Sequence, residues 1–222
     1  MKLWRRITPA ALALCLLAAA GCAESTPPPL DRRTVPGPTA SDPAKPCTNE
    51  AATTATSTAG AAGGSSGSVA AAFDHATNTI TVTGGTGITF DRLSKAVGNP
   101  AALRELTPGE WLLGANLEID KGASVTMAAP DVRWLKMRSV GPTYSAIKVF
   151  GGGLTVTGSC ITSWDDAKQQ VDANPADGRS FMLARDGGQM TIDKAQLAYL
   201  GFGDTESYGL SWRTEGTGGH IK

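Results

Sequence analysis

The chain has 222 residues, with 20 basic and 20 acidic side chains, 41% hydrophobic residues and 27 glycines. Without Lys2, Arg5 and Arg6, which belong to an N-terminal leader, 17 basic residues face 20 acidic ones, and no basic cluster stands out. This weakly acidic balance argues against a nucleic-acid partner. The first third of the sequence contributes little to any core, so we expect a globular part of about 150 residues.

The chain opens with the features of an export signal. Three basic residues precede the small, apolar run Ala10–Ala20, which is too short to remain as a membrane-spanning helix. The run ends in Ala19-Ala20-Gly21-Cys22, which resembles the lipobox of bacterial lipoproteins. The resemblance implies a signal peptide over 1–21, a lipid anchor at Cys22, and a location on the outer face of the cytoplasmic membrane or in the cell envelope. The alternative is an ordinary secretory signal that is cleaved at a small residue.

Residues 22–72 are expected to form a lipid-anchored, low-complexity tether. Ala23–Pro46 contains mainly Pro, Thr, Ser, Ala and charged residues, a composition that favours extended polyproline-like conformations. Ala51–Ala71 continues with Ala, Thr, Ser and Gly. It has too few large apolar groups to offset the chain entropy, so we expect it to be disordered.

Two cysteines remain after the leader and the anchor are set aside. Cys47 and Cys160 would occupy a compartment where disulfides persist, so one interpretation is a bridge between them. The other is that Cys160 is a small buried hydrophobic residue and Cys47 is free. Neither cysteine has a CxxC partner, so we predict no metal site and no cofactor.

Residues 73–110 are predicted to hold an N-terminal cap and the first coil of a solenoid. Order is expected from Asn78 onward, where apolar residues alternate with threonines and glycines. Asp91 stands where a helix N-cap would, and Asn99-Pro100 ends that short helix. Such a helix would cover the open end of a stack of coils.

Residues 111–222 repeat a short alternating apolar run, a glycine-rich corner and another short run. If Val125, Leu154, Met190 and His220 are equivalent, the repeats are 29, 36 and 30 residues apart. Coils of this size cannot bury their apolar side chains alone and must stack on one another. The sequence therefore predicts an all-β, right-handed parallel β-helix. Its last coil lacks a capping unit, so we expect it to be incomplete at the C-terminus.

The segment from Trp164 to Arg179 interrupts the repeat. It contains Asp165, Asp166 and Asp172 and no periodic apolar face, so it is expected to be a loop between coils. Loops of this kind often shape a binding groove in solenoids, although a merely solvated acidic loop is the alternative.

Five stretches, in this order and spacing, resemble the N-terminal coils of the periplasmic alginate epimerases, the poly(β-D-mannuronate) C5-epimerases. They are Trp111–Ile119, Gly122–Ser124, Leu154–Gly158, Ile161–Trp164 and Ser207–Ser211. The likeness covers about half of the chain. It implies a parallel β-helix that binds a uronate polymer along one sheet face, removes the proton from C5 and returns one from the opposite side.

The catalytic motif of that family, Asp-Pro-His-Asp, is absent from this sequence. Asp42-Pro43 is followed by alanine, and the imidazoles of His75 and His220 are expected to be ordinary surface groups. We therefore assign no catalytic residue, and we expect the catalytic coils to be missing from this chain. Whether the chain is an isomerase is left open.

The resemblance implies an acidic polysaccharide as partner, and cations would have to bind its carboxylates. The candidate binding residues are Lys148, Arg179, Arg185, Arg213 and the aromatic Tyr208. A solvated β-face is the simpler interpretation of each one. The alternative function is a noncatalytic surface module for adhesion or scaffolding. The sequence has no repeated glycine-aspartate nonapeptide, so calcium is not predicted.

Overall fold

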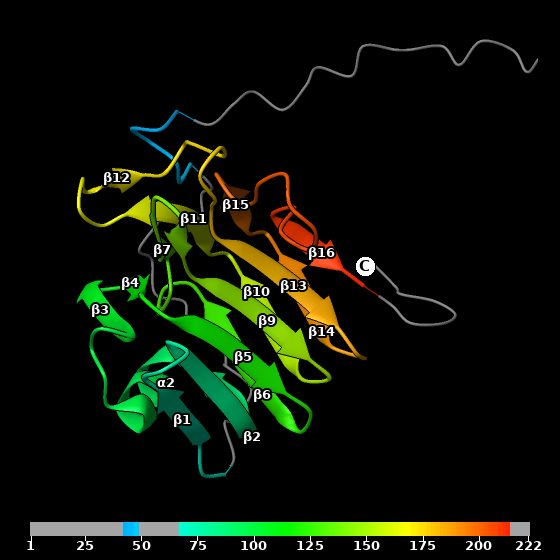
Figure 1. Ribbon diagram of the computed structural model, residues 1–222. Helices are drawn as coiled ribbons and strands as arrows, with labels where there is room; N and C mark the ends of the chain where they lie inside the picture. Colours follow the sequence, from blue (N-terminus) through cyan, green and yellow to red (C-terminus); the bar gives the residue numbers. More distant parts are fainter. Residues whose placement is uncertain (1–41, 49–66, 214–222) are drawn as a thin grey trace, which may run out of the picture. The chain divides into compact units, whose positions relative to one another are not determined.

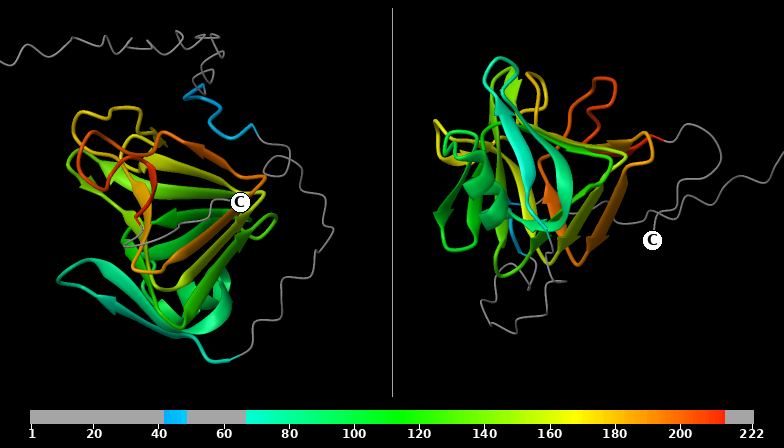
Figure 2. Two further views of the ribbon diagram at one scale, coloured as in Figure 1. Left: turned by 90° about the vertical axis from the view of Figure 1, so that its right-hand side faces the viewer. Right: turned by 90° about the horizontal axis from the view of Figure 1, so that it is seen from below.

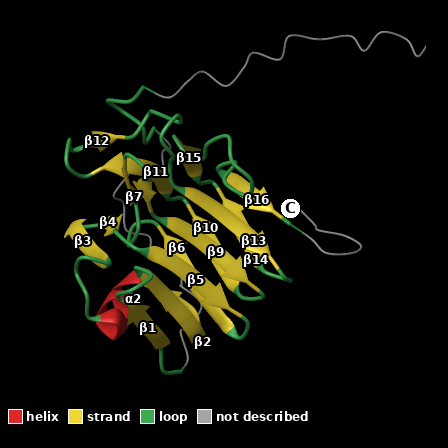
Figure 3. Cartoon of the chain, viewed as in Figure 1, coloured by secondary structure: helices red, strands yellow, loops and turns green. Residues whose placement is uncertain are grey.

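The computed structural model describes residues 42–48 and 67–213. The signal peptide 1–21, the lipidation site Cys22 and His220 lie outside the described residues. Within them the chain forms sixteen strands and one helix, so it is predominantly β (Figure 3). No helix in this described part is long and apolar enough to cross a membrane.

The strands stack into three parallel sheets, which we call faces A, B and C (Figures 1 and 2). Face A consists of the first half of β2 (Thr79–Thr89), β5 (Asn116–Asp120), β9 (Ala146–Phe150), β13 (Phe181–Arg185) and β16 (Leu210–Trp212). Face B consists of the second half of β2, β6 (Ala123–Ala128), β10 (Gly153–Thr157) and β14 (Gln189–Asp193). Face C consists of β4 (Glu110–Leu113), β7 (Trp134–Val140), β11 (Cys160–Asp165) and β15 (Gln196–Ala198).

Each coil contributes one strand to each face in turn, which makes the fold the right-handed parallel β-helix that the sequence predicts. The repeat spacing is confirmed where it can be followed, because Val125 pairs with Leu154 and Leu154 with Met190. Ile88 of β2 extends this row by one coil, since it pairs with Val125.

Apolar side chains from each coil form continuous inward rows. On face A, Ile80, Leu117, Ile147 and Met182 occupy equivalent positions and all are fully buried. Burial of each such side chain stabilises the fold by about 1.5–3 kcal/mol. The intervening residues of the same strands point outward, because side chains alternate along a strand. The outward residues are therefore the ones available for binding.

Glycine is required where the chain turns from face A to face B. A Cβ atom on Gly188 would lie 2.1 Å from the carbonyl oxygen of Val149, and one on Gly152 would lie 2.6 Å from that of Asp120. In both places the corner of one coil packs directly on the backbone of the coil before it. This contact explains the glycine-rich corners of the repeat.

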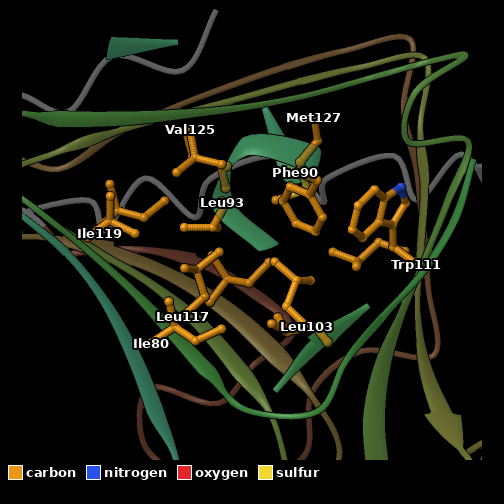
Figure 4. Close-up of a cluster of buried hydrophobic side chains, with 14 of the residues drawn as sticks. Ile80, Phe90, Leu93, Leu103, Trp111, Leu117, Ile119, Val125 and Met127 are labelled. Atoms are coloured by element: carbon orange, nitrogen blue, oxygen red, sulfur yellow. The ribbon is translucent and has the colours of Figure 1, made fainter. Parts of the chain in front are cut away.

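The helix α2 (Phe90–Val97) covers the N-terminal end of the core. Phe90 and Leu93 are buried, and the Phe90 ring meets Trp111 edge to face with centroids 5.6 Å apart (Figure 4). The expected N-cap at Asp91 is wrong, because Thr89 has the extended backbone of a cap and its hydroxyl accepts from the Arg92 amide. Asp91 lies in the first turn of the helix and pairs instead with Lys95.

Order begins before Asn78, earlier than expected. Strand β1 (Ala70–Asp74) pairs antiparallel with β2. Ala71 and Phe73 of this strand and Val69 just before it pack against the core. These contacts give the alanine-rich segment enough apolar burial to form a strand. The remaining short strands, β3 (Leu103–Thr107), β8 (Thr143–Tyr144) and β12 (Gln170–Val171), pair antiparallel with β4, β7 and β11 respectively.

Candidate functional site

The outer side of face A carries three of the four candidate cations, one on each of three successive coils. Lys148 is on β9 and Arg185 ends β13. Arg213 follows β16, and its amide donates to the carbonyl of Ala184, so its backbone runs beside Arg185. Arg185 and Arg213 are therefore in register on adjacent coils. Lys148 pairs with Leu183 and lies two residues before the register of Arg185, so the three side chains form an oblique row on the outer side of face A.

Each of these cations has an acidic partner. Lys148 Nζ lies 3.2 Å from Oε1 of Glu118, its register partner on β5. Arg185 Nη1 lies 3.5 Å from Glu206 Oε2, and Arg213 pairs with the other oxygen of that carboxylate. Glu206 thus bridges the two arginines.

Arg185 makes two further contacts that orient its side chain. Its Nε lies 3.2 Å from Asp186 Oδ2, and the guanidinium carbon is 4.7 Å from the centroid of the Phe150 ring. Phe150 is the register partner of Arg185 on β9, so the ring supports the guanidinium from the neighbouring coil. A planar guanidinium held in this way suits recognition of a carboxylate.

Arg179 is not part of this row. Its Nε donates to the carbonyl of Gly201 at 2.8 Å and its Nη2 to that of Leu200 at 3.3 Å. Burial lowers the pKa of Arg179. The side chain holds the loop before β16 in place, which is a structural role.

Tyr208 lies two residues beyond Glu206 and is 69% exposed, so its ring is open to solvent. Three other aromatic side chains are packed and are not open for stacking on a sugar. Tyr144 contacts Phe181 and Phe202, and Trp212 packs against the core. Tyr199 packs against a cluster on face C, and burial raises its pKa.

A second group of charged and aromatic side chains lies on the outer side of face C, and sequence reasoning missed it. Lys136 Nζ lies 3.0 Å from Glu110 Oε2, 4.1 Å from the centroid of the Trp134 ring and 4.3 Å from that of Trp164. The two indoles meet edge to face with centroids 5.3 Å apart. The available signal was the alternation in Trp134-Leu135-Lys136, which puts both outer residues on one side of a strand.

A segment of the expected tether lies against this face. Asp42–Thr48, which we call the strap, is joined to β11 by a disulfide between Cys47 and Cys160, with the two Cα atoms 5.6 Å apart. Gln196 clamps the strap from β15: its Nε2 donates to the Pro46 carbonyl at 2.6 Å, and its Oε1 accepts from the Thr48 amide at 2.7 Å. Of the two interpretations of the cysteines, the structure has the bridge, and Cys160 is also fully buried.

The register of the face C strands explains why the strap lies against this face. Glu110, Trp134, Cys160 and Gln196 are equivalent positions on the four strands of face C, and all alternate with core residues. They therefore form one outward row across the coils. The strap is attached to two members of that row and covers part of it.

Two cavities border the strap and share Ala44. One, of about 480 Å³, is lined by Ala44, Lys45, Pro46, Cys47, Thr48, Glu110, Arg133 and Trp134. The other, of about 580 Å³, is lined by Pro43, Ala44, Asp165, Lys168, Gln170, Val171, Asp172, Ala173 and Asn174. The Trp164–Arg179 segment, which includes the short strand β12, therefore forms one wall of this second cavity.

Asp165 organises the start of this loop. Its Oδ1 accepts from the amides of Ala167 and Lys168 at 3.1 and 2.9 Å, and Lys168 Nζ lies 2.9 Å from Oδ2. Burial alone raises the pKa of Asp165, but the hydrogen bonds from Lys168 and Ala167 outweigh it and hold the pKa below its ordinary value. In the described part of the chain, no group of three His, Cys, Asp or Glu side chains is arranged to hold a metal ion.

Comparison with known proteins finds the same architecture. The periplasmic alginate epimerase AlgG matches with a TM-score of 0.52 and 22% identity, over 60% of this chain and 30% of that one. A singly and a doubly substituted variant of the same enzyme match with TM-scores of 0.51 at the same identity and coverage. No protein-family model matches the sequence, and no curated protein matches it. The chain thus spans about a third of the length of these epimerase structures and shares their β-helical fold.

Proposed function

We propose that this chain is the β-helix of an exported lipoprotein that binds acidic polysaccharide along face A, in the manner of a uronate-polymer epimerase. One observation carries the proposal. Lys148, Arg185 and Arg213 place one cation on each of three successive coils of face A. Adjacent strands are about 4.8 Å apart, so Arg185 and Arg213, which are in register, present two cations at about that spacing. Lys148 extends this group obliquely on the next coil, which gives an acidic polymer three cations on one face.

The acidic partners of these cations are compatible with binding. Lys148 and Glu118 are 29% and 26% exposed, and Arg213 is 58% exposed. Ion pairs that are open to solvent contribute about 0–1 kcal/mol, so a polymer carboxylate can replace or share the internal partner at little cost. The arginines offer paired N–H donors to such a carboxylate.

The proposed location follows from the leader. The sequence resembles a lipoprotein signal that ends at Cys22, which would attach the mature chain to a membrane. The disulfide between Cys47 and Cys160 supports export, because such bonds persist in oxidising compartments. We therefore propose a lipid-anchored protein of the cell envelope.

We propose binding, without turnover, as the activity of these 222 residues. The sequence has no Asp-Pro-His-Asp motif. Among the described residues, the one imidazole is that of His75, which packs edge to face against Phe73 beside β1. A noncatalytic adhesion or scaffolding module is the second candidate, and the internal pairing of all three face A cations favours it.

The test is calorimetric titration of the purified lipoprotein in detergent with polymannuronate and with neutral mannan. Polymannuronate should bind, mannan should not, and the affinity should fall with added salt. Arg185→Gln and Arg213→Gln should each weaken binding about tenfold, the effect of losing about 1.5 kcal/mol from a charged hydrogen bond.

Arg104→Gln is the matched control, because Arg104 donates to the Pro100 carbonyl from β3, outside face A. Equal binding of both polymers, or an equal loss in the control, would contradict the proposal. The absence of any polymer binding would favour the scaffolding module. Exchange of the C5 proton into deuterated water, followed by NMR, would reveal turnover.

A further inference from the structure

We propose that the 480 Å³ cavity between the strap and face C is a second ligand site, which binds a single carboxylated sugar ring independently of face A. Its volume is in the range of small-molecule sites, about 300–1,000 Å³. Its lining combines one indole with two cations and one carboxylate. A flat aromatic surface and charged hydrogen-bonding groups together are the chemistry that a sugar acid requires.

Trp134 is held rigidly for this role. Its Nε1 donates to Thr162 Oγ1 at 3.0 Å, the Trp164 ring meets it edge to face, and Lys136 Nζ lies over its ring. These contacts fix both the position and the rotation of the indole before any ligand arrives. An aromatic platform that needs no reordering binds with a smaller entropic loss.

The cavity supplies cations without carboxylate partners. Among the described residues, no Asp or Glu lies within ion-pair distance of Lys45 or Arg133. One nitrogen of Arg133, Nη2, donates to the Pro108 carbonyl. That bond positions the guanidinium, which has five N–H donors in total, and leaves others for a ligand carboxylate. The cations of face A differ, because each is already paired.

Glu110 does not cancel this positive charge, because Lys136 Nζ lies 3.0 Å from it and neutralises it. Its carboxylate retains acceptor positions for sugar hydroxyl groups. The lining therefore favours a ring that carries both a carboxylate and hydroxyls. A neutral sugar would leave the two cations without an anion, and a simple carboxylate would not use the indole.

The site depends on the strap, which supplies five of its eight lining residues, Ala44 through Thr48. Since the disulfide to Cys160 and the Gln196 clamp hold those residues in place, breaking the disulfide should weaken ligand binding as well as stability. Face A contains no residue of the strap. The two sites can therefore be separated by mutation.

The experiment follows the indole N–H resonance of Trp134 by NMR in the full lipoprotein while D-mannuronate, D-glucuronate, D-mannose or acetate is added. The uronates should shift this resonance saturably, and mannose and acetate should bind at least tenfold more weakly. Arg133→Gln should weaken uronate binding about tenfold, and Arg133→Lys should lose less. Ala44→Trp, at an exposed strap position, should fill the cavity and abolish binding.

Lys45→Gln is a second charge variant at an exposed position, so its effect does not depend on tolerance of a change at Arg133. Arg104→Gln, on β3 and outside both the cavity and face A, is the control and should leave the uronate-induced shift of Trp134 unchanged. Equal binding of mannose and mannuronate, or full uronate binding by both Arg133→Gln and Ala44→Trp, would overturn the proposal. Failure of polymer binding on face A would leave these results unaffected, so the two proposals fail separately.

Discussion

Faces A and C each carry a Glu–Lys pair between neighbouring strands, and the two pairs have different surroundings. On face A, Lys148 lies 3.2 Å from Glu118, and its side chain is 29% exposed. On face C, Lys136 lies 3.0 Å from Glu110, is 10% exposed and contacts two indole rings. The distances are nearly the same, so the difference lies in how far water reaches each ammonium group.

That difference separates the proposed binding surface, face A, from a pair on face C that is part of the packed structure. The face A pair is open to solvent, contributes little to stability and can be exchanged for a ligand carboxylate. The face C pair is largely removed from water, so loss of one partner leaves a buried charge uncompensated. On face C the cations that we propose for ligand binding are instead Lys45, in the strap, and Arg133, just before β7.

The largest expected effect comes from removing the disulfide that holds the strap on face C. Cys47→Ser opens a covalent loop that closes over 113 residues, and it should lower the free energy of unfolding by about 4 kcal/mol. Urea unfolding of the variant and of the wild type measures this. Reduction of the wild type should reproduce the loss, whereas the same reductant should leave the variant unchanged. A variant as stable as the wild type would mean that the strap is not held by this bond.

The two Glu–Lys pairs provide a matched test of the comparison. Glu110→Gln should lower the free energy of unfolding by about 2 kcal/mol, because Lys136 remains charged and largely buried. Glu118→Gln should cost less than about 1 kcal/mol, because water can solvate Lys148. Both are measured by denaturant unfolding. Equal losses would remove the distinction between the faces.

Glu206 is the acidic partner of both arginines on face A, so its removal tests whether these cations bind a polymer. Glu206→Gln removes the carboxylate that bridges Arg185 and Arg213 and frees two cations on face A. Polymannuronate affinity, measured by calorimetry, should rise several-fold, with a change in stability below about 1 kcal/mol. A weaker affinity would show that Glu206 positions the arginines for the polymer and does not compete with it.

The smallest effect concerns the loop beside face C. The pKa of Asp165 is lowered in the folded state, so its carboxylate stabilises the fold above the ordinary aspartate pKa of about 3.9. That contribution is lost as the pH falls through the lowered value. Asp165→Asn should therefore be less stable than the wild type at pH 7, and this difference should shrink below about pH 4. Thermal unfolding as a function of pH measures it, and a difference independent of pH would rule out this role.

The sequence predicted the features of this fold that repeat. The equivalence of Val125, Leu154 and Met190 follows from a regular spacing, and the glycine corners such as Gly188 follow from close packing of one coil on the next. Both are properties of short segments that recur. The expected N-cap at Asp91 failed because a threonine two residues earlier also satisfies the cap pattern, and the end of β2 decides between them.

The strap and the face C cluster could not be predicted in the same way. Asp42–Thr48 has the composition of a flexible tether, and its position depends on a cysteine 113 residues away and on the Gln196 side chain. The contact of Lys136 with Trp164 depends on which residues of two distant strands point outward at the same level. Composition and periodicity contain no information on such pairings until the register is known.

The most direct test of face A as the polysaccharide surface is an NMR titration of the isotopically labelled lipoprotein with trimannuronate. The backbone amides of β9, β13 and β16 near Lys148, Arg185 and Arg213 should shift saturably, while the amides of face B should not. Unchanged amides on those three strands at saturating ligand, or shifts confined to face B, would contradict this expectation.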